Sequence, residues 1–341
     1  MNSFGRLFRV SIFGESHGPL VGVTLDGVPA GIALDEKSFE KDLNRRKSGK
    51  RGTTPRKESD LPEIATGLFQ GRTTGAPLTV LFRNENTLSG DYANLVAHPR
   101  PSHSDWVAAR KFGGFNDYRG GGHFSGRLTA PLVFAGAIAK LILKEKGVEV
   151  TSRISNVAGI ADPTPEEIEA AILAAKADLD SVGGRIACAV TGLPAGLGAP
   201  DFGCNVEGIF SQYLFAVPAV KGVDFGAGVA FSLMRGSEAN DPLTVKDGRV
   251  TALSNHSGGV NGGISNGMPL IFRSCVRPTP SIYKEQQTVD LAKNEAATLQ
   301  IQGRHDPCIL HRAAIVQTAA TAFGLLDLLT QNGGGQRQAG R

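Results

Sequence analysis

Short apolar runs that end at glycine or proline recur along the chain and predict β-strands. Several of them are rich in Val, Ile and Phe, the composition expected of strands in a buried sheet. The predicted strands are residues 7–13, 20–25, 78–82, 184–191, 229–233 and 270–276.

Helical patterns interleave with these strands. Asp35 is placed to cap one helix, and Thr164-Pro165-Glu166-Glu167 has the capping-box pattern, with proline at the first helical position, for another that reaches about Leu179. Residues 127–146 and 310–329 predict two long, largely apolar helices. Because strand and helix do not alternate strictly, the pattern favours an α+β layered fold over a doubly wound parallel sheet.

The length of 341 residues suggests two domains on the soft rule of about 150 residues each, although one large unit can also reach this size. Beyond Asn332 the chain is rich in Gly and Gln, which predicts a flexible tail over 332–341. The longest apolar stretch, 130–143, is interrupted by Lys140 and is too short to cross a bilayer. No membrane association is therefore expected.

The composition narrows the class of protein. Hydrophobic residues make up 41% and charged residues 20%, enough for a substantial core. The four cysteines are widely spaced, which argues against structural zinc or a disulfide scaffold, and no HExxH or CxxC spacing predicts a metal site. The first ten residues lack an apolar signal region, so a cytoplasmic protein is expected.

Glycine and positive charge are unevenly distributed. Glycine accounts for 44 of the 341 residues, well above its ordinary share of about 7%. This excess indicates turns and places where the backbone approaches a ligand closely. The net charge of +4 is too small to indicate nucleic acid. A basic run is either a solvated loop or a segment that binds phosphate or carboxylate. It consists of Arg45, Arg46, Lys47, Lys50, Arg51, Arg56 and Lys57.

Five short motifs combine glycine with residues that can do chemistry. Each is weak alone: a lone histidine in a turn is usually incidental, and Ser104 and Asp105 are explained as the cap and first turn of a helix. The glycines of 120–122 feed a helix start and favour an anion site. The motifs are Gly14-Glu15-Ser16-His17-Gly18, the segment 101–106, the segment 117–127, the segment 254–267 and Arg304-His305-Asp306-Pro307-Cys308.

Familiar enzyme signatures are missing. Ser16, His103 and Asp306 could be drawn as a hydrolase triad, but no GxSxG elbow is present. Neither a Walker A loop nor GxGxxG occurs in the glycine-rich segments. Two further alternatives stay open at this point: a flavin reductase, and an anion- or RNA-binding protein that uses the basic run.

An ordered set of segments resembles the signature series of the chorismate synthase family, and the resemblance runs from about Phe4 to Leu329. The set is Gly14–Gly18, the basic segment Asp42–Arg51, Arg119–Gly122, Ser254–Gly259 and Arg304–Cys308. The resemblance implies a compact β-α-β sandwich in a single domain, 1–331, assembled as a homotetramer. It also implies a carbon–oxygen lyase of the shikimate pathway to aromatic amino acids. That enzyme converts 5-enolpyruvylshikimate 3-phosphate (EPSP) to chorismate by anti 1,4-elimination of phosphate. Reduced FMN is required, with no net redox change.

The resemblance also implies residue roles. His17, with Ser16 beside it, is the expected acid toward the departing phosphate. His103 is expected to protonate the reduced flavin, and Asp306 to help remove the C6 proton. Ser125 lies near flavin and substrate, and the substrate-side arginines are Arg46, Arg51 and Arg127. The expected flavin contacts are His123, Phe124, Ser125, Ala219, Asn255, Gly262, Arg277, Pro278, Thr279, Pro280, Ser281 and Arg304.

The chain departs from the family pattern at a few of these positions. His123, Phe124 and Gly126 stand in a segment that many relatives write Gly-Arg-Ser-Ser-Ala-Arg, and Arg277 replaces a common lysine. Only backbone contacts are carried over there. Pro218 stands where Asn is common, and Ser102 replaces a frequent glycine. No large insertion of the bifunctional kind is present, which predicts a monofunctional enzyme supplied with reduced FMN by an external flavin reductase.

Overall fold

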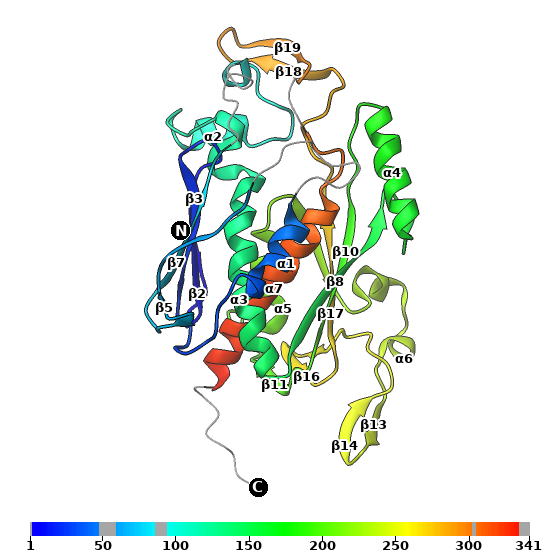
Figure 1. Cartoon of the computed structure of the whole chain (residues 1–341). Coiled ribbons are helices and arrows are strands. Elements are labelled where there is room, and N and C mark those ends of the chain that lie inside the picture. Colours follow the sequence, from blue (N-terminus) through cyan, green and yellow to red (C-terminus); the bar gives the residue numbers. More distant parts are fainter. Residues whose placement is uncertain (1, 48–58, 86–93, 302–304, 334–341) are drawn as a thin grey trace.

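The protein is a three-layered α+β sandwich, with helices held between two antiparallel sheets (Figure 1). This confirms the predicted fold class. The computed structural model describes residues 2–47, 59–85, 94–301 and 305–333.

In the first sheet, buried and more exposed side chains alternate along the strands. In β7, Leu78, Val80 and Phe82 are buried on one face, which is the period of two that a half-buried strand requires. In order across the sheet, its strands are β1 (Ser3–Phe4), β2 (Arg9–Gly14), β3 (Leu20–Asp26), β7 (Leu78–Arg83) and β4 (Glu63–Thr66).

The second sheet covers the opposite side of the helices. Strand β10 pairs with β17 along its length, and Leu270, Phe272 and Val276 of β17 face the core. In order across the sheet, its strands are β12 (Val220–Phe225), β17 (Leu270–Val276), β10 (Gly184–Thr191), β8 (Glu149–Val157) and β9 (Ile160–Ala161).

Smaller strand pairs decorate the edges of the sandwich. A three-stranded sheet and three two-stranded hairpins are separate from the two main sheets in their hydrogen bonding. They are β11 (Ala195–Gly198) with β16 (Ile264–Asn266) and β15 (Val260–Asn261), β5 (Leu68–Phe69) with β6 (Arg72–Thr73), β13 (Leu243–Lys246) with β14 (Arg249–Ala252), and β18 (Gln286–Asp290) with β19 (Glu295–Leu299).

The helices α3 and α7 form the centre of the middle layer. Both are apolar almost all round, because each meets a neighbour on every side. They approach closely at Gly136, where an added Cβ would lie 2.2 Å from the Cβ of Ala319. The α-helices are α1 (Lys37–Arg46), α2 (Asp105–Lys111), α3 (Thr129–Glu145), α4 (Pro165–Ala177), α5 (Val206–Phe215), α6 (Gly236–Ala239) and α7 (Leu310–Gly333).

One buried hydrophobic cluster joins the middle layer to both sheets, from Phe8 on the first to Phe272 on the second. By length and composition, the stretches Arg119–Glu145 and Leu310–Asn332 could each cross a membrane. Their apolar windows are 78% and 89% buried inside the protein, as core helices are.

Several local predictions can be compared with these elements. The capping box at Thr164 is present, with its side chain accepting from the Glu167 N–H and Glu167 reaching back. The strand predicted over 229–233 is wrong: it is a 3-10 helix, η4 (Gly228–Leu233). Gly226 and Gly228, with φ of 56° and 57°, turn the chain away from the sheet directly after β12.

Candidate active site

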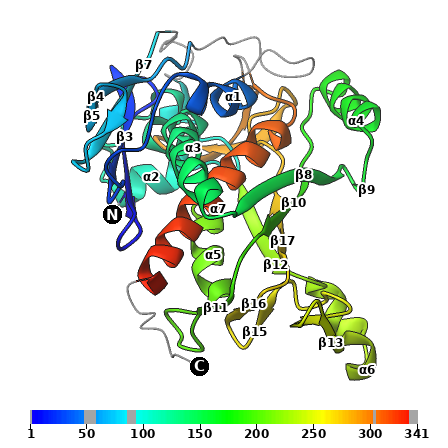
Figure 2. The same cartoon turned by 60° about the horizontal axis from the view of Figure 1, so that its bottom comes forward.

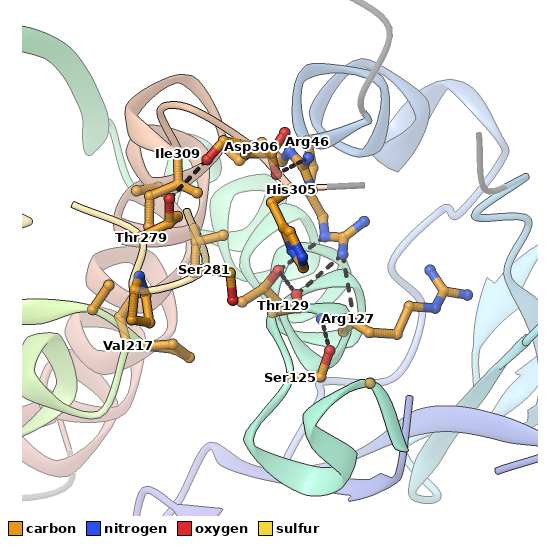
Figure 3. A pocket seen from close by; sticks show the side chains of 18 of the residues that line it. Arg46, Ser125, Arg127, Thr129, Val217, Thr279, Ser281, His305, Asp306 and Ile309 are labelled. Atoms are coloured by element: carbon orange, nitrogen blue, oxygen red, sulfur yellow. Dashed lines mark hydrogen bonds and ion pairs between the residues drawn. The ribbon is translucent and has the colours of Figure 1, made fainter. Parts of the chain in front are cut away.

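A cavity of about 320 Å³ opens where the start of α7 meets α1, the turn before α3 and the loop after β17. Its walls differ in chemistry. Val217, Thr279 and Ile309 lie along one side, and Ser125 and Arg127 lie opposite them (Figure 3). One wall is largely apolar and the other carries guanidinium groups, so the cavity suits a ligand with both a flat apolar part and anionic groups.

Two buried arginines share one buried carboxylate at this cavity. Arg46 and Arg127 are each 5% exposed, and both pair with Asp60, which is 2% exposed. Arg46 donates to Asp60 Oδ2 at 2.6 Å, and its other donors reach Thr129 Oγ1 and the Gly126 carbonyl at 3.0 and 3.2 Å. The three groups together carry a net positive charge in a desolvated place.

The electrostatics of Arg46 reflect this crowding. Burial lowers the pKa of Arg46 to about 10, opposed by Asp60 and reinforced by the like charges of Arg127 and Arg312. An anion in the cavity would relieve the repulsion between these guanidinium groups.

The described residues of the predicted basic run have different environments. Arg46 is buried and Lys47 lines the cavity, whereas Arg45 is exposed. Arg51, a predicted substrate ligand, lies outside the described residues.

His103 reaches the cavity from the turn before α2. Its Nδ1 lies 2.6 Å from Oδ1 of Asp105, and burial lowers the pKa of His103 although the bond to Asp105 raises it. Ser104 stands at the N-cap position of α2 but makes no capping hydrogen bond. The explanation of Asp105 as a favourable first-turn residue is thus incomplete, because its side chain turns back to Arg100 and His103.

Asp306 also lines the cavity, just before α7. Its carboxylate forms an ion pair with Arg312 in the first turn of that helix, and its carbonyl accepts from Thr279 Oγ1 at 2.7 Å. Arg312 is itself a cavity residue, and its Nε is buried without a hydrogen-bond partner among the described residues. This orphan donor is the kind of group that a bound anion would satisfy.

Ser16 and His17 are buried directly behind the cavity wall. Gly120 lines the cavity, and a Cβ added to it would lie 2.4 Å from His17 Cδ2 and 2.6 Å from Ser16 Oγ. Ser16 Oγ donates to the Gly120 carbonyl at 3.0 Å. Neither Ser16 nor His17 is among the described residues that line the cavity, so one glycine separates them from its space.

The 3-10 turn η2 (Arg119–Phe124) joins this wall to the His17 loop. Gly120, Gly121 and Gly122 all have positive φ, a conformation that suits glycine alone in such a run. His123 Nδ1 lies 3.1 Å from the Gly14 carbonyl, and Phe124 is 41% exposed and packs beside Phe112. Neither His123 nor Phe124 is among the described residues that line the cavity.

Ser125, which the resemblance implies lies near flavin and substrate, is a residue of the cavity wall. It also caps η3 (Gly126–Leu128), since its Oγ accepts from the Arg127 N–H at 3.3 Å.

The residues predicted to contact a flavin fall into two groups. Ala219, Thr279, Pro280 and Ser281 line the cavity with Ser125. Arg277 and Pro278 lie beside it: the Arg277 N–H donates to the Ala219 carbonyl, and its Nη1 donates to the Ser102 carbonyl at 2.7 Å. Arg304 lies outside the described residues.

Asn255 and Gly262 are not brought to the cavity. The loop that holds Asn255 and Gly262 comes before β17, which begins at Leu270, whereas the cavity residues Thr279–Ser281 come after β17, which ends at Val276. The length of this strand, about 20 Å, therefore separates the loop from the cavity. In Figure 1 β16 is at the foot of the molecule, far below the start of α7. Asn255 Nδ2 donates to the Pro269 carbonyl at 2.8 Å, which is a structural role.

Asp241 organises the same loop. It accepts hydrogen bonds from Ser254 Oγ and from the N–H groups of His256 and Ser257. Burial alone would raise the pKa of Asp241, but these bonds lower it to about 2. The folding of this loop therefore accounts for Ser254, His256 and Ser257, whereas the buried Oδ1 of Asn255 has no hydrogen-bond partner among the described residues.

Several cavity residues escaped sequence reasoning. They are Asp60, Arg100, Thr129, His305 and Arg312. Only His305 belonged to a named motif, and it projects into the centre of the view in Figure 3. In the described ranges, no group of three His, Cys, Asp or Glu side chains is placed to hold a metal ion.

Comparison with known proteins identifies the family. The family model described as chorismate synthase matches residues 8–330. A chorismate synthase of Chitinophaga pinensis is 53% identical over 329 residues, covering 96% of each chain, and one of Thermococcus kodakarensis is 43% identical over 343 residues, covering 95% and 96%. The solved structure titled "Crystal Structure of Chorismate Synthase" superposes with a TM-score of 0.73 at 24% identity, over 96% of this chain and 93% of that one, which supports the fold. The chain belongs to the chorismate synthase family.

Proposed function

We propose that the chain converts EPSP to chorismate by anti 1,4-elimination of the 3-phosphate, with reduced FMN and no net redox change. The observation that supports this most is the charge of the cavity. Arg46, Arg100, Arg127 and Arg312 converge from four separate segments on one space that also holds His103 and Asp306. A substrate with a phosphate and two carboxylates matches such a set of guanidinium groups.

The residues present also fit a flavin. Val217, Ile309, Ala313 and Val316 offer an apolar surface to a flat ring, and the unsatisfied Nε of Arg312 offers a donor. Ala219, Thr279, Pro280, Ser281 and Ser125 would hold the cofactor, which, when bound, supplies electron density transiently and takes it back. Asn255 and Gly262 are too distant to do so within one protomer.

The protein's own groups then have assigned tasks. His103 and Asp306 supply proton transfer at the cavity, and Arg46 and Arg127 bind the anionic groups of the substrate. His17, behind Gly120, is the proposed acid toward the departing phosphate. In this role its imidazole must reach the phosphate past Gly120, so either the substrate binds close to this glycine or the Gly120 segment moves aside. Ser16 supports His17 through its bond to the Gly120 carbonyl.

The proposed assembly is a homotetramer in the cytoplasm. The hairpin β13–β14 projects from the body of the protein and exposes Leu243, Val245 and Val250 at 76%, 70% and 70% (Figure 2). Exposed apolar side chains concentrated on a projecting hairpin favour contact with another copy.

A reductase assay separates the proposed lyase from a flavin reductase. With NADPH, oxidised FMN and EPSP, the purified protein alone is expected to form no chorismate and to consume no NADPH. Adding a separate flavin reductase is expected to start chorismate formation. Stoichiometric NADPH consumption by the protein alone would instead support the flavin reductase, and turnover without added reductase would overturn the monofunctional assignment.

The Gly120→Ala variant tests whether the wall between His17 and the cavity matters. An alanine there would have φ near 59° and would press its Cβ against His17 and Ser16. We expect turnover to fall about 10²-fold, since misplacement of a catalytic group by about 1 Å has that scale of effect.

The matched control is Gly71→Ala, where φ is 71° but no atom lies within 4 Å of the added Cβ. It carries the same backbone penalty, about 1–2 kcal/mol, without the contact. Turnover measured at saturating EPSP and reduced FMN should be unchanged in Gly71→Ala. Equal turnover in both variants would show that the Gly120 wall has no part in catalysis.

A further inference from the structure

Asp105 lies beside two residues of the cavity, Arg100 and His103, and both of its carboxylate oxygens are engaged. Its Oδ2 accepts from the Arg100 N–H at 3.1 Å and from Arg100 Nε at 2.8 Å. Its Oδ1 accepts from Arg100 Nη2 at 2.8 Å and lies 2.6 Å from His103 Nδ1. Both side chains are largely buried, at 5% exposure for Arg100 and 8% for Asp105.

This geometry fixes the protonation of the imidazole. Although burial would raise the pKa of Asp105, its bonds to Arg100 and His103 hold that pKa far below its ordinary value, so the carboxylate is an acceptor only. A nitrogen 2.6 Å from it must carry the hydrogen. Arg100 Nη2 also lies 3.1 Å from His103 Nδ1, but an Nδ1 that bears a proton has no lone pair to accept from it.

The other ring nitrogen is then the reactive one. His103 lines the cavity, and its Nε2 lies on the side of Gly121, 3.7 Å from where a Cβ on that glycine would be. Because Nδ1 holds the hydrogen, Nε2 presents a lone pair in the neutral form.

We propose that Asp105, clamped by Arg100, is a positioning residue that fixes the Nδ1–H tautomer of His103 and so presents Nε2 to the cavity. Arg100 is held in turn by Ser281, whose Oγ accepts from Nη1 at 3.1 Å. The chain Ser281–Arg100–Asp105–His103 links the loop after β17 to the imidazole. The proton-transfer role of His103 rests on the proposed function, whereas its tautomer does not.

The Asp105→Asn variant is expected to reverse the tautomer, because an amide NH2 group cannot accept the hydrogen bonds that Arg100 donates. Two Arg100 donors face the Oδ2 position and only one faces the Oδ1 position. The amide oxygen is therefore expected at the Oδ2 position, and the NH2 group at the Oδ1 position, where it faces His103. It would then donate to Nδ1 and move the imidazole proton to Nε2. The charged groups around His103 are Asp105, Arg100 and Arg277. With the carboxylate gone, the two arginines and burial remain, and all of them lower the pKa of His103.

The test is 15N NMR of the histidine side chains with a pH titration, using His103→Gln to assign the signal. The unsubstituted protein should show protonated Nδ1 in neutral His103. Asp105→Asn should show protonated Nε2 and a lower titration midpoint, and Asp105→Glu should restore the first pattern. Turnover should fall by as much as about 10⁴-fold in Asp105→Asn, the scale found where asparagine in place of such a carboxylate leaves a catalytic imidazole in the wrong tautomer.

Asp290→Asn is the matched control, because Asp290 Oδ2 lies 3.5 Å from Nε2 of His98, away from the cavity. It should leave the His103 signal and turnover unchanged. Protonated Nε2 in the unsubstituted protein would overturn the inference even if Asp105→Asn failed to fold. An unchanged tautomer in Asp105→Asn would also overturn it. The expected tautomers in a protein with no chorismate synthase activity would support the positioning role and refute the proposed function separately.

Discussion

His103→Ala and His17→Ala are each expected to lower turnover by about 10²–10⁴-fold while FMN binding is retained, as for loss of a group that transfers protons. For His103 the loss follows directly from its place on the cavity wall. For His17 a loss of this size is expected only if its imidazole reaches the substrate past Gly120. Steady-state turnover with reduced FMN, together with fluorescence titration of FMN, checks both.

His98→Ala is the control for these variants, since His98 is a histidine paired with a carboxylate outside the cavity lining. Its turnover should match that of the unsubstituted protein. Full turnover in His103→Ala would remove the imidazole from the mechanism. Full turnover in His17→Ala alone would leave His17 as a buried residue that packs beneath the glycine turn.

Asp60→Asn is expected to lower the free energy of unfolding by about 3–5 kcal/mol, the cost of breaking a buried ion pair from one side. The carboxylate is 1% exposed and serves two guanidinium groups, Arg46 and Arg127, which would both stay buried without a counter-charge. Asparagine keeps the size of the side chain and tolerates the left-handed backbone, φ 47°, at this position. Urea unfolding measures the change.

Asp162→Asn offers a close match for comparison. Asp162 also has a positive φ, 44°, and pairs with Arg153 at 2.6 Å, but its side chain is 71% exposed. An exposed pair of this kind contributes at most about 1 kcal/mol. If both variants lost the same small amount of stability, Asp60 would not be the group that holds the two arginines in place.

Much of the fold could be predicted from local pattern. The strands 184–191 and 270–276 end where predicted, because each is an apolar run bounded by residues that stop a ladder. Helix α7 runs to Gly333, four residues past the predicted 329, because nothing at that point of the sequence marks a stop. The strand predicted over 229–233 was wrong because the composition of this segment suits a strand, whereas Gly226 and Gly228, with positive φ just before it, turn the chain away from the sheet.

The site was predictable only where a motif carried it. His103, Asp306 and Ser125 lie in short glycine- or proline-marked segments and do line the cavity. Asp60 and Arg312 have no such mark, because their roles arise from pairing in the folded chain. Asp60 pairs with Arg127, sixty-seven residues away, and Arg312 pairs with Asp306, six residues earlier in the turn before α7. Asp105 was explained by its place in the first turn of a helix, but its side chain instead pairs with Arg100 and His103, which sequence reasoning did not link to it.

The most direct test of the central claim is an anaerobic reaction of the purified protein with EPSP and photoreduced FMN, followed for chorismate and for released phosphate. If the arginine-lined cavity catalyses the elimination, the two products appear in equal amounts while a catalytic quantity of flavin stays reduced. Absence of both products, under conditions where FMN and EPSP are shown to bind, would contradict the proposed function.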